Sequence, residues 1–311
     1  MQVFHQVHNR GGERVANDIE NGLRKRGHDI STIAVKWREP DSPVAEVVKD
    51  VRVFADKSGM GSNVVVAIAR LLRHLIKERP DAILMHTTAA GFVVAPITRL
   101  AGIRQRVLIH HNAIGTNQGG LWVPLEKLYG ATGMYSDIVF VSDRSHELIS
   151  DWPDPYLKRA SVIFNGIELP APESQMTRQA ILERHGLSPD TLLAISVGSL
   201  EAQKNQRVLV EALAGTSGVH LIIAGEGSKR PEIESAIKRT NAPVTLLGNI
   251  EMEEVSALFH ECDVLLFPSI HEGRALTLLE AADSGIGIIA SDIPENVSVL
   301  CLLYTSDAAD E

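Results

Sequence analysis

Short runs of apolar residues alternate along the chain with longer amphipathic segments. The runs fall at about 2–7, 30–35, 51–54, 82–86, 106–110, 137–141 and 161–164, and then at about 191–197, 219–224, 243–247, 263–267 and 286–290. Short strands rich in Val, Ile and Leu, separated by helices, are typical of parallel sheets that helices cover on both faces. The pattern therefore predicts an α/β protein built of doubly wound sheets.

Two local features suggest how these elements are divided. Directly after Gly11 and Gly12, apolar residues recur at helical spacing, as a first helix requires. Residues 169–180 are polar and interrupted by proline, which predicts a linker. We therefore expect an N-terminal domain over 1–168 and a C-terminal domain over 181–300.

Composition narrows the class of protein. The chain has 311 residues, 44% hydrophobic and 22% charged, with a formal net charge of −9, which argues against a nucleic-acid partner. We find no signal-peptide pattern and no apolar run long enough to span a membrane, and these features predict a cytoplasmic protein. The two cysteines give neither a disulfide framework nor a metal-binding spacing, and no other segment has metal-ligand spacing, so we expect no metal. We expect no cofactor either.

The segment 268–292 carries the most specific chemistry, because it holds two glutamates eight residues apart. Glu272 lies in a polar turn after the run 263–267, and Glu280 lies inside the helix that this turn opens. Eight residues advance a helix by roughly 12 Å, so both carboxylates can reach one long polar ligand, such as a nucleotide joined to a sugar. The alternative is a solvated glutamate in a turn and a buried glutamate paired with a basic side chain.

The residues around this pair, P-S-x-x-E-G-x-x-L-x-L-L-E-A-x-x-x-G, resemble the donor-sugar motif of retaining glycosyltransferases of family 4, among the group 1 glycosyltransferases. Further matching segments follow in the family's order: G-G-E-R-V (11–15), L-R-K-R-G-H (23–28), L-I-H-H-N (108–112), F-N-G-I-E (164–168), S-V-G-S-L-E-A-Q-K-N (196–205), I-I-A-G-E-G (222–227) and L-L-G-N-I (246–250). The resemblance implies the GT-B fold, in which two Rossmann-like domains face a cleft. It also implies a hexosyltransferase-type enzyme of bacterial polysaccharide or cell-envelope biosynthesis.

The resemblance assigns roles to particular residues. Lys204 and a helix N-terminus after the run 191–197 would hold the donor diphosphate, and we expect that helix over 203–214. The loop at Gly11 and Gly12 would lie over the same diphosphate, and a histidine after the run 106–110 would lie near the donor sugar. His111 fits this position better than His110, although the adjacent pair leaves the register open. The expected catalytic residues are Glu272, His111 and Lys204, and the expected donor-binding residues are Gly11, Gly12, Lys204, Gly248, Glu272, Gly273, Arg274, Ala275, Leu276 and Glu280.

Three observations qualify this assignment. Ser199 stands where many relatives carry arginine, which thins the expected phosphate clamp. Gly225 and Gly227 resemble part of a dinucleotide fingerprint, but Arg230 occupies the third glycine position, so we interpret them as a structural turn and disfavour a dehydrogenase. There is no convincing Asp-X-Asp before a strand end, which favours metal-independent transfer. The resemblance implies retention of the anomeric configuration by front-face attack, without a protein nucleophile.

The partners implied are a nucleotide sugar and a glycan or lipid-linked acceptor. Residues 64–79 combine an apolar stripe with basic residues opposite, a pattern that fits peripheral contact with the inner face of a membrane. An ordinary helix that covers the sheet and has a solvated face is the interpretation we favour.

The last residues, 301–311, follow no periodicity, and their reverse translation resembles the end of a sequencing-library adapter. We therefore expect a non-native tail and a second domain that is truncated at its C-terminal side, which can leave this chain inactive. Two other functions stay open: a nucleotide-sugar-binding module without catalysis, and a GT-B-shaped nucleotide-sugar epimerase.

Overall fold

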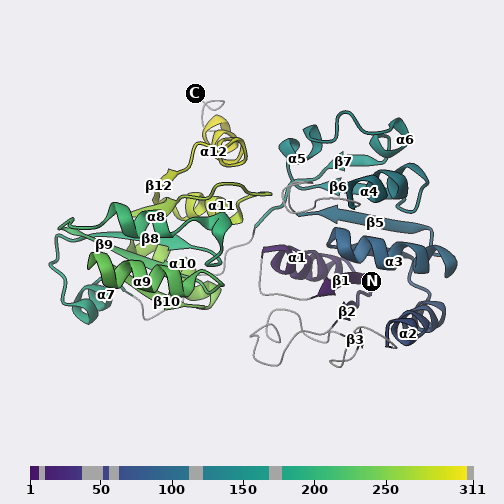
Figure 1. Cartoon of the computed structure of the whole chain (residues 1–311), viewed down its shortest axis with the longest axis horizontal. Helices are drawn as coiled ribbons and strands as arrows, with labels where there is room; N and C mark the ends of the chain where they lie inside the picture. The colour runs from purple at the N-terminus through teal and green to yellow at the C-terminus, as the bar shows by residue number, and fades with distance from the viewer. Residues whose placement is uncertain (7–10, 37–51, 56–62, 112–121, 168–176, 307–311) are drawn as a thin grey trace. The chain divides into compact units, whose positions relative to one another are not determined.

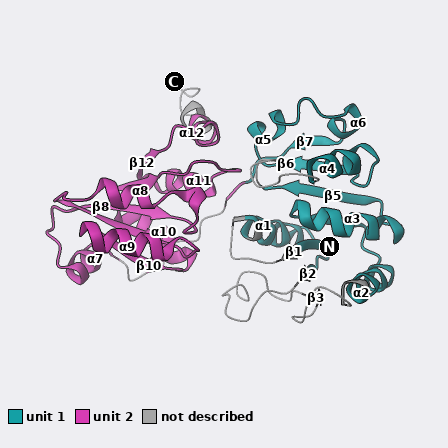
Figure 2. Cartoon of the chain, viewed as in Figure 1, with its two compact units in different colours: residues 1–165 teal, residues 166–311 magenta. Residues whose placement is uncertain are grey.

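The computed structural model describes residues 1–6, 11–36, 52–55, 63–111, 122–167 and 177–306. The chain divides into two compact units, Met1–Asn165 (unit 1) and Gly166–Glu311 (unit 2), which Figure 2 colours teal and magenta. Each unit is a parallel sheet with helices between most of its strands (Figure 1). The predicted α/β architecture with two doubly wound sheets is confirmed.

Within its described residues, unit 1 has a seven-stranded sheet in the order β3-β2-β1-β4-β5-β6-β7. Its strands are β1 (Gln2–Gln6), β2 (Thr32–Lys36), β3 (Arg52–Ala55), β4 (Ala82–Met85), β5 (Gln105–His110), β6 (Asp137–Phe140) and β7 (Ala160–Val162). β1 is central, because Val3 pairs with Ile33 of β2 on one side and with Met85 of β4 on the other. The direction in which the chain winds outward therefore reverses between β1 and β4.

The helices of unit 1 supply the apolar side chains that cover this sheet. They are α1 (Gly11–Lys25), α2 (Asn63–Glu78), α3 (Thr88–Leu100), α4 (Trp122–Ala131), α5 (Asp143–Glu147) and α6 (Asp154–Leu157). Leu71 and Leu75 of α2 are 1% exposed and share a core cluster with Ile83 and Met85 of β4. Burial of such side chains stabilises the fold by about 1.5–3 kcal/mol each.

Unit 2 has, among its described residues, a five-stranded sheet in the order β10-β9-β8-β11-β12. Its strands are β8 (Leu192–Val197), β9 (Val219–Ala224), β10 (Val244–Gly248), β11 (Val264–Phe267) and β12 (Gly287–Ala290). Leu193 and Ile195 of β8 belong to one core cluster, and Ala194 between them belongs to another. Because alternate residues of a strand point to opposite faces, both faces of this sheet are covered.

The helical elements of unit 2 lie between these strands and after the last of them. They are α7 (Arg178–His185), the 3-10 turn η2 (Ala202–Lys204), α8 (Arg207–Ala212), α9 (Arg230–Thr240), α10 (Met252–Glu261), α11 (Leu276–Ser284) and α12 (Pro294–Ser306).

Two local predictions differ from the structure. The helix expected over 203–214 is wrong at its start: Asn205 has a left-handed φ of 53°, which separates η2 from α8. The expected linker over 169–180 extends too far, because α7 begins at Arg178, and residues 169–176 of that linker lie outside the described residues. The segment after 300, which follows no periodicity, is helical as far as Ser306, where α12 ends.

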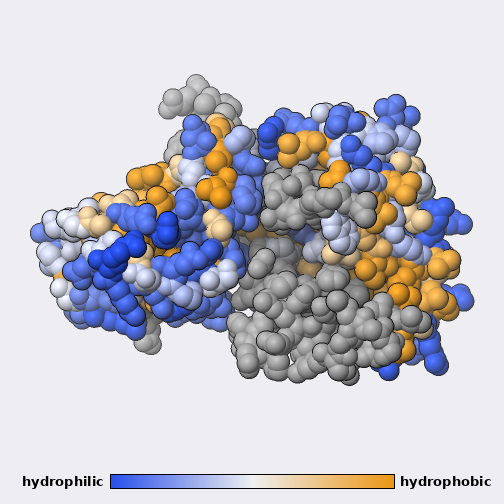
Figure 3. Space-filling model, in the orientation of Figure 1, coloured by the Kyte–Doolittle hydropathy of each residue, from blue (hydrophilic) through white to orange (hydrophobic). Residues whose placement is uncertain are grey.

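The segment 64–79 forms α2, and this helix covers the sheet, as the favoured interpretation predicts. α2 buries Ala67, Leu71 and Leu75 and leaves Val66 and Ile76 about half exposed. Figure 3 shows apolar surface on the part of unit 1 where α3 ends, and Leu100 at that end is 80% exposed. Within the described residues, no helix is long and apolar enough to cross a membrane.

Candidate functional site

The strand order of unit 2 marks the place where a ligand is expected. β8 lies between β9 and β11, so the connections that leave β8 and β11 diverge toward opposite edges of the sheet. In open parallel sheets, ligands bind in the crevice that such a reversal opens beyond the carboxyl ends of the strands. Lys204 follows β8 and Glu272 follows β11, so the fold brings these two predicted residues to the same crevice.

Lys204 and Glu272 form an ion pair across this boundary. The Lys204 Nζ lies 2.7 Å from the Glu272 Oε1, and the two side chains are only 16% and 6% exposed. The ammonium also lies 4.9 Å from the centre of the Phe267 ring, a cation–π contact. An ammonium has three N–H donors, so the pair with Glu272 leaves Lys204 able to meet a second acceptor such as a phosphate oxygen.

The backbone and one amide fix the ion pair in place. The Ile270 N–H donates to the Gln203 carbonyl at 2.9 Å and so ties the connection after β11 to η2. The Gln203 Nε2 also donates to the second oxygen of Glu272, at 3.5 Å. Neither Gln203 nor Phe267 was predicted as a site residue. Phe267 ends an apolar run, but its contact with Lys204 follows only once β8 and β11 are known to be neighbours.

The turns after β8, β9 and β10 form a tight frame beside this pair. The Gly225 N–H donates to the Gly248 carbonyl at 2.7 Å, and the Gln206 Nε2 donates to the carbonyls of Gly198 and Ser199 at 3.4 and 3.2 Å. A Cβ atom on Gly225 would overlap the Gly198 carbonyl oxygen, so this position requires glycine. The structure supports a structural turn here, and it places the predicted donor residue Gly248 in the same frame.

The remaining predicted residues of unit 2 line the entry to α11. Gly273, Arg274 and Ala275 lead from Glu272 into the helix, which begins at Leu276. Glu280 follows inside the helix and is 3% exposed. The ribose-binding role expected of Glu280 stays a prediction.

Two further polar atoms point to a ligand near α11. The Ser269 Oγ and the His271 Nε2 are buried and meet no hydrogen-bond partner within the described part of the chain. Buried polar groups in native proteins nearly always have a partner, so such atoms are typical of a site that a ligand or water completes. Sequence reasoning missed both residues, although they flank the predicted Glu272.

Unit 1 gathers its own predicted residues at the equivalent edge of its sheet. Gly11 and Gly12 begin α1, which follows β1, and His111 directly follows β5. A Cβ atom on Gly12 would lie 3.4 Å from the His111 Cδ2, so glycine allows the start of α1 to approach the imidazole closely. The structure therefore brings Gly12 and His111 together, in a different unit from Lys204 and Glu272.

The two adjacent histidines have different surroundings. His110 is 3% exposed, stacks on Phe140 and lies 3.3 Å from the Glu126 carboxylate, so it belongs to the interior of unit 1. His111 stacks instead on His86 beside Gly12. The register that the sequence left open therefore favours His111 as the residue beside the glycine loop.

Burial keeps the His86 and His111 imidazoles uncharged. Desolvation, with a smaller effect of the neighbouring His110, lowers the pKa of His111 to about 4. Desolvation and the nearby His111 lower the pKa of His86 well below its ordinary value. Both imidazoles are therefore neutral near pH 7, and His111 can serve as a hydrogen-bonding group but does not carry a standing positive charge.

Within the described residues, no group of three or more His, Cys, Asp and Glu side chains is arranged to hold a metal ion. Lys204, the residue predicted to hold the diphosphate, lies beside the Glu272 carboxylate and the Phe267 ring.

Comparisons with known proteins agree with both units. The family described as "Glycosyltransferase Family 4" matches residues 9–170, and the one described as "Glycosyl transferases group 1" matches residues 177–305. An uncharacterized glycosyltransferase of Methanocaldococcus jannaschii, MJ1607, is 24% identical over 88% of this chain and 75% of its own length. A glycogen synthase of Mycobacterium tuberculosis is 26% identical over 90% of this chain and 74% of its own.

Solved structures share the fold of the whole described chain. The Anabaena protein Alr3699/HepE, in complex with UDP and glucose, superposes with a TM-score of 0.76 at 18% identity, over 96% of this chain and 82% of its own. WaaG, a glycosyltransferase involved in lipopolysaccharide biosynthesis, gives a TM-score of 0.70 at 17% identity, over 99% of this chain and 84% of its own. The pair of parallel α/β units is thus the GT-B architecture.

Proposed function

Because the chain belongs to Glycosyltransferase Family 4, we propose that it moves a sugar from a nucleoside diphosphate sugar to a hydroxyl of a glycan, lipid-linked or small-molecule acceptor. The observation that carries this proposal is the buried pair of Lys204 and Glu272 at the strand-order reversal of unit 2. A cation and a carboxylate side by side suit a ligand that offers a phosphate next to hydroxyl groups.

Each residue of the crevice has a role in this proposal. Lys204 stabilises the charge that develops on the leaving diphosphate. Glu272, with the backbone of Gly273, Arg274, Ala275 and Leu276, holds the hydroxyls of the donor sugar. Glu280 holds the ribose hydroxyls. Because Glu272 also fixes the Lys204 ammonium at 2.7 Å, the same carboxylate orients the group that meets the diphosphate.

The proposed reaction retains the anomeric configuration. The bond between the sugar C1 and the diphosphate oxygen breaks, and the acceptor oxygen bonds to C1 on the same face. The acceptor proton passes to the departing phosphate oxygen, so the chain needs no protein nucleophile and no metal ion. In this proposal unit 1 contributes the Gly11–Gly12 loop and His111.

The relatives support the substrate class and a biological setting. Alr3699/HepE has been crystallised with UDP-glucose, and relatives in Escherichia coli are named O-antigen biosynthesis glycosyltransferases. We accordingly propose a uridine-type donor as the first to test and a role in polysaccharide or cell-envelope biosynthesis. Contact of α2 with an anionic membrane belongs to this proposal as a way to reach a lipid-linked acceptor.

The test incubates the chain with UDP-, GDP- and ADP-sugars, with and without a panel of oligosaccharide acceptors. Release of nucleoside diphosphate is followed, and the anomeric configuration of the product is read by proton NMR. We expect release that depends on the acceptor, a retained configuration, and a loss of donor affinity of about tenfold or more in Glu280→Ala, as for a hydrogen bond to a charged group.

The same assay separates the other functions. Conversion of the donor to an epimer without acceptor would identify an epimerase. Tight donor binding with no turnover across the panel would identify a binding module.

A further inference from the structure

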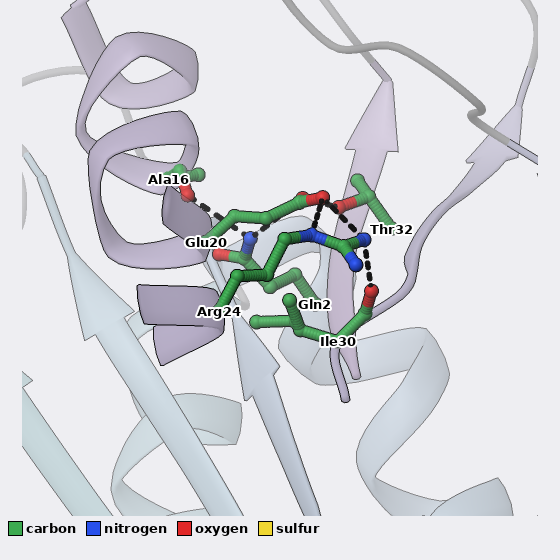
Figure 4. A network of polar contacts seen from close by, with 6 residues as sticks. All are labelled: Gln2, Ala16, Glu20, Arg24, Ile30 and Thr32. Carbon is green, nitrogen blue, oxygen red and sulfur yellow. Dashed lines mark hydrogen bonds and ion pairs between the residues drawn. The ribbon is translucent and has the colours of Figure 1, made fainter. Parts of the chain in front are cut away.

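A line of hydrogen bonds crosses unit 1 from α1 to the predicted site histidine. It begins at Glu20 of α1, which accepts from the Gln2 Nε2 at 3.5 Å and from the Thr32 Oγ1 at 2.8 Å. Figure 4 shows Gln2 of β1 among the residues of this network. The line continues from the Gln2 Oε1 to the His86 Nε2 at 2.6 Å, and from the His86 Nδ1 to the His111 Nε2 at 3.1 Å.

The orientation of the Gln2 amide is fixed by its surroundings. Its Nε2 lies 3.0 Å from the Ala16 carbonyl oxygen and faces the Glu20 carboxylate (Figure 4). A carbonyl and a carboxylate only accept, so the amide nitrogen must point toward them and the amide oxygen must point toward His86. Gln2 is 1% exposed, so water does not offer another arrangement.

The remaining directions follow from this one. An amide oxygen only accepts, so the His86 Nε2 must carry the proton that bonds to Gln2. A neutral imidazole has one N–H and one lone pair, so the His86 Nδ1 must accept. The His111 Nε2 must then carry the proton that bonds to His86, and the His111 Nδ1 is left with a lone pair.

The Nδ1 atom of His111 is therefore of particular interest. It is buried, and no described residue gives it a hydrogen bond. The neutrality of both rings near pH 7 agrees with this arrangement, since a charged ring would have to donate from both nitrogens. An unprotonated buried nitrogen without a partner calls for a hydrogen-bond donor from outside the described residues.

We propose that Gln2 and His86 are positioning residues that hold His111 in the tautomer with its lone pair on Nδ1, so that this histidine meets the substrate as a hydrogen-bond acceptor. The group that it meets is a sugar hydroxyl, an identification that rests on the proposed function. A hydroxyl can donate to this lone pair, whereas a phosphate oxygen cannot. His111 thus reads a hydroxyl of the substrate and does not contact the diphosphate.

This arrangement also gives the site a means of selection. A site built to bond a substrate hydroxyl rejects an analogue that lacks it, because the buried acceptor then stays unpaired. A donor whose matching hydroxyl is replaced by hydrogen or fluorine should therefore bind more weakly than its parent. The affinity for UDP, which lacks the sugar, should not depend on the tautomer of His111.

The first test reads the tautomer directly and does not depend on activity. The full chain is labelled with ¹⁵N-histidine, and long-range ¹H–¹⁵N correlation spectra are recorded near pH 7, with His111→Asn used to assign the resonances. We expect His111 protonated on Nε2 and unprotonated on Nδ1. A proton on Nδ1, or a charged ring, would overturn the proposal even if the chain transfers sugar.

A variant tests the role of Gln2. In Gln2→Met the amide oxygen that accepts from the His86 Nε2 is lost, so the His86 proton is no longer fixed on that nitrogen. The His111 resonances should then change from those of one tautomer to those of a mixture. Thr98→Val is the matched control, because it removes another buried side-chain hydrogen bond of unit 1, that of the Thr98 Oγ1 to the Ala95 carbonyl. Unchanged His111 resonances in a folded Gln2→Met chain would show that Gln2 does not set the tautomer of His111.

Titration then tests the ligand. Adding UDP-glucose should shift the His111 Nδ1 resonance, and adding UDP should leave it in place. If UDP-glucose binds by calorimetry without moving this resonance, the hydroxyl assignment is wrong and the proposed function is unaffected. If no nucleotide sugar binds, the proposed function fails and the hydroxyl assignment fails with it, whereas the tautomer keeps its own measurement.

Discussion

At the scale of single residues, the pair of Lys204 and Glu272 is the most demanding feature of unit 2. Moving two charges out of water is costly, and only close contact with further hydrogen bonds offsets the cost. Gln203 supplies one of these bonds to Glu272, and Phe267 supplies a favourable face for the ammonium. Because an apolar pair would be as stable, we attribute the presence of these charges at this position to a ligand.

Removing one partner of this pair should expose its cost. Lys204→Met leaves the buried Glu272 carboxylate without a cation and should lower the free energy of unfolding of unit 2 by about 3 kcal/mol. Urea unfolding followed by circular dichroism measures this change. Lys238→Met, the same substitution at an exposed position of α9, should change it by less than about 0.5 kcal/mol. Equal effects of the two substitutions would show that the Lys204 pair is not a buried one.

The histidine cluster makes a prediction about pH. The pKa of His111 lies at about 4 in the folded chain against an ordinary 6.5, so the unfolded chain binds more protons between these values. Stability should therefore be complete above pH 6.5 and fall as the pH drops toward 4, by about 3 kcal/mol for His111. All three tryptophans, Trp37, Trp122 and Trp152, lie in unit 1, so tryptophan fluorescence reports its unfolding.

The control for this measurement is His111→Asn, which should weaken the dependence of the unfolding midpoint on pH and leave the part that comes from His86. A tryptophan transition that stays constant between pH 7 and pH 4.5 in the unsubstituted chain would contradict the low pKa.

Sequence reasoning reached some of these residues and not others. Lys204, Glu272 and His111 were accessible because each follows an apolar run, where parallel sheets place ligands. His86 was noticed only as a residue that ends a run, with a capping role equally open. Its link to Gln2 spans 84 residues of sequence and exists because β1 and β4 are neighbours, which no local pattern reveals.

At the scale of elements, strands were predicted better than the connections between them. Each short apolar run became a strand within two residues at either end, for example 219–224 and β9 (Val219–Ala224), because buried parallel strands need continuous apolar residues. The connection after β8 was predicted wrongly as one helix. Its backbone depends on Asn205 at positive φ and on the contact of Gly198 with Gly225, and these are tertiary features.

The close packing of these turns can be tested with one methyl group. Gly225→Ala should push the turn after β8 away from β9 and destabilise unit 2 by about 3 kcal/mol or more, because the new Cβ overlaps the Gly198 carbonyl. Gly186→Ala is the matched control: it also has a positive φ, of 61°, but its Cβ would meet nothing within 4 Å. That control should lose only about 1 kcal/mol, the cost of the strained backbone.

Unfolding by urea, followed by circular dichroism, compares the two variants. A Gly225→Ala chain as stable as Gly186→Ala would mean that the turns after β8 and β9 are not held together as described.

At the scale of the whole molecule, two sheets with the same winding reversal each gather a set of functional side chains at one edge. Unit 1 supplies Gly12 and His111, and unit 2 supplies Lys204, Glu272 and Glu280. The family matches span both units, which supports the proposal that the two sets of residues serve one activity.

The central claim is that a nucleotide sugar binds at the strand-order reversal of unit 2. Hydrogen–deuterium exchange of the full chain, with and without saturating UDP-glucose, tests it most directly, because it locates protection along the sequence. The account predicts slower exchange in peptides that cover residues 198–206 and 269–280, and no such change in Lys204→Met at the same ligand concentration. Protection confined to other segments, or unaltered by Lys204→Met, would contradict it.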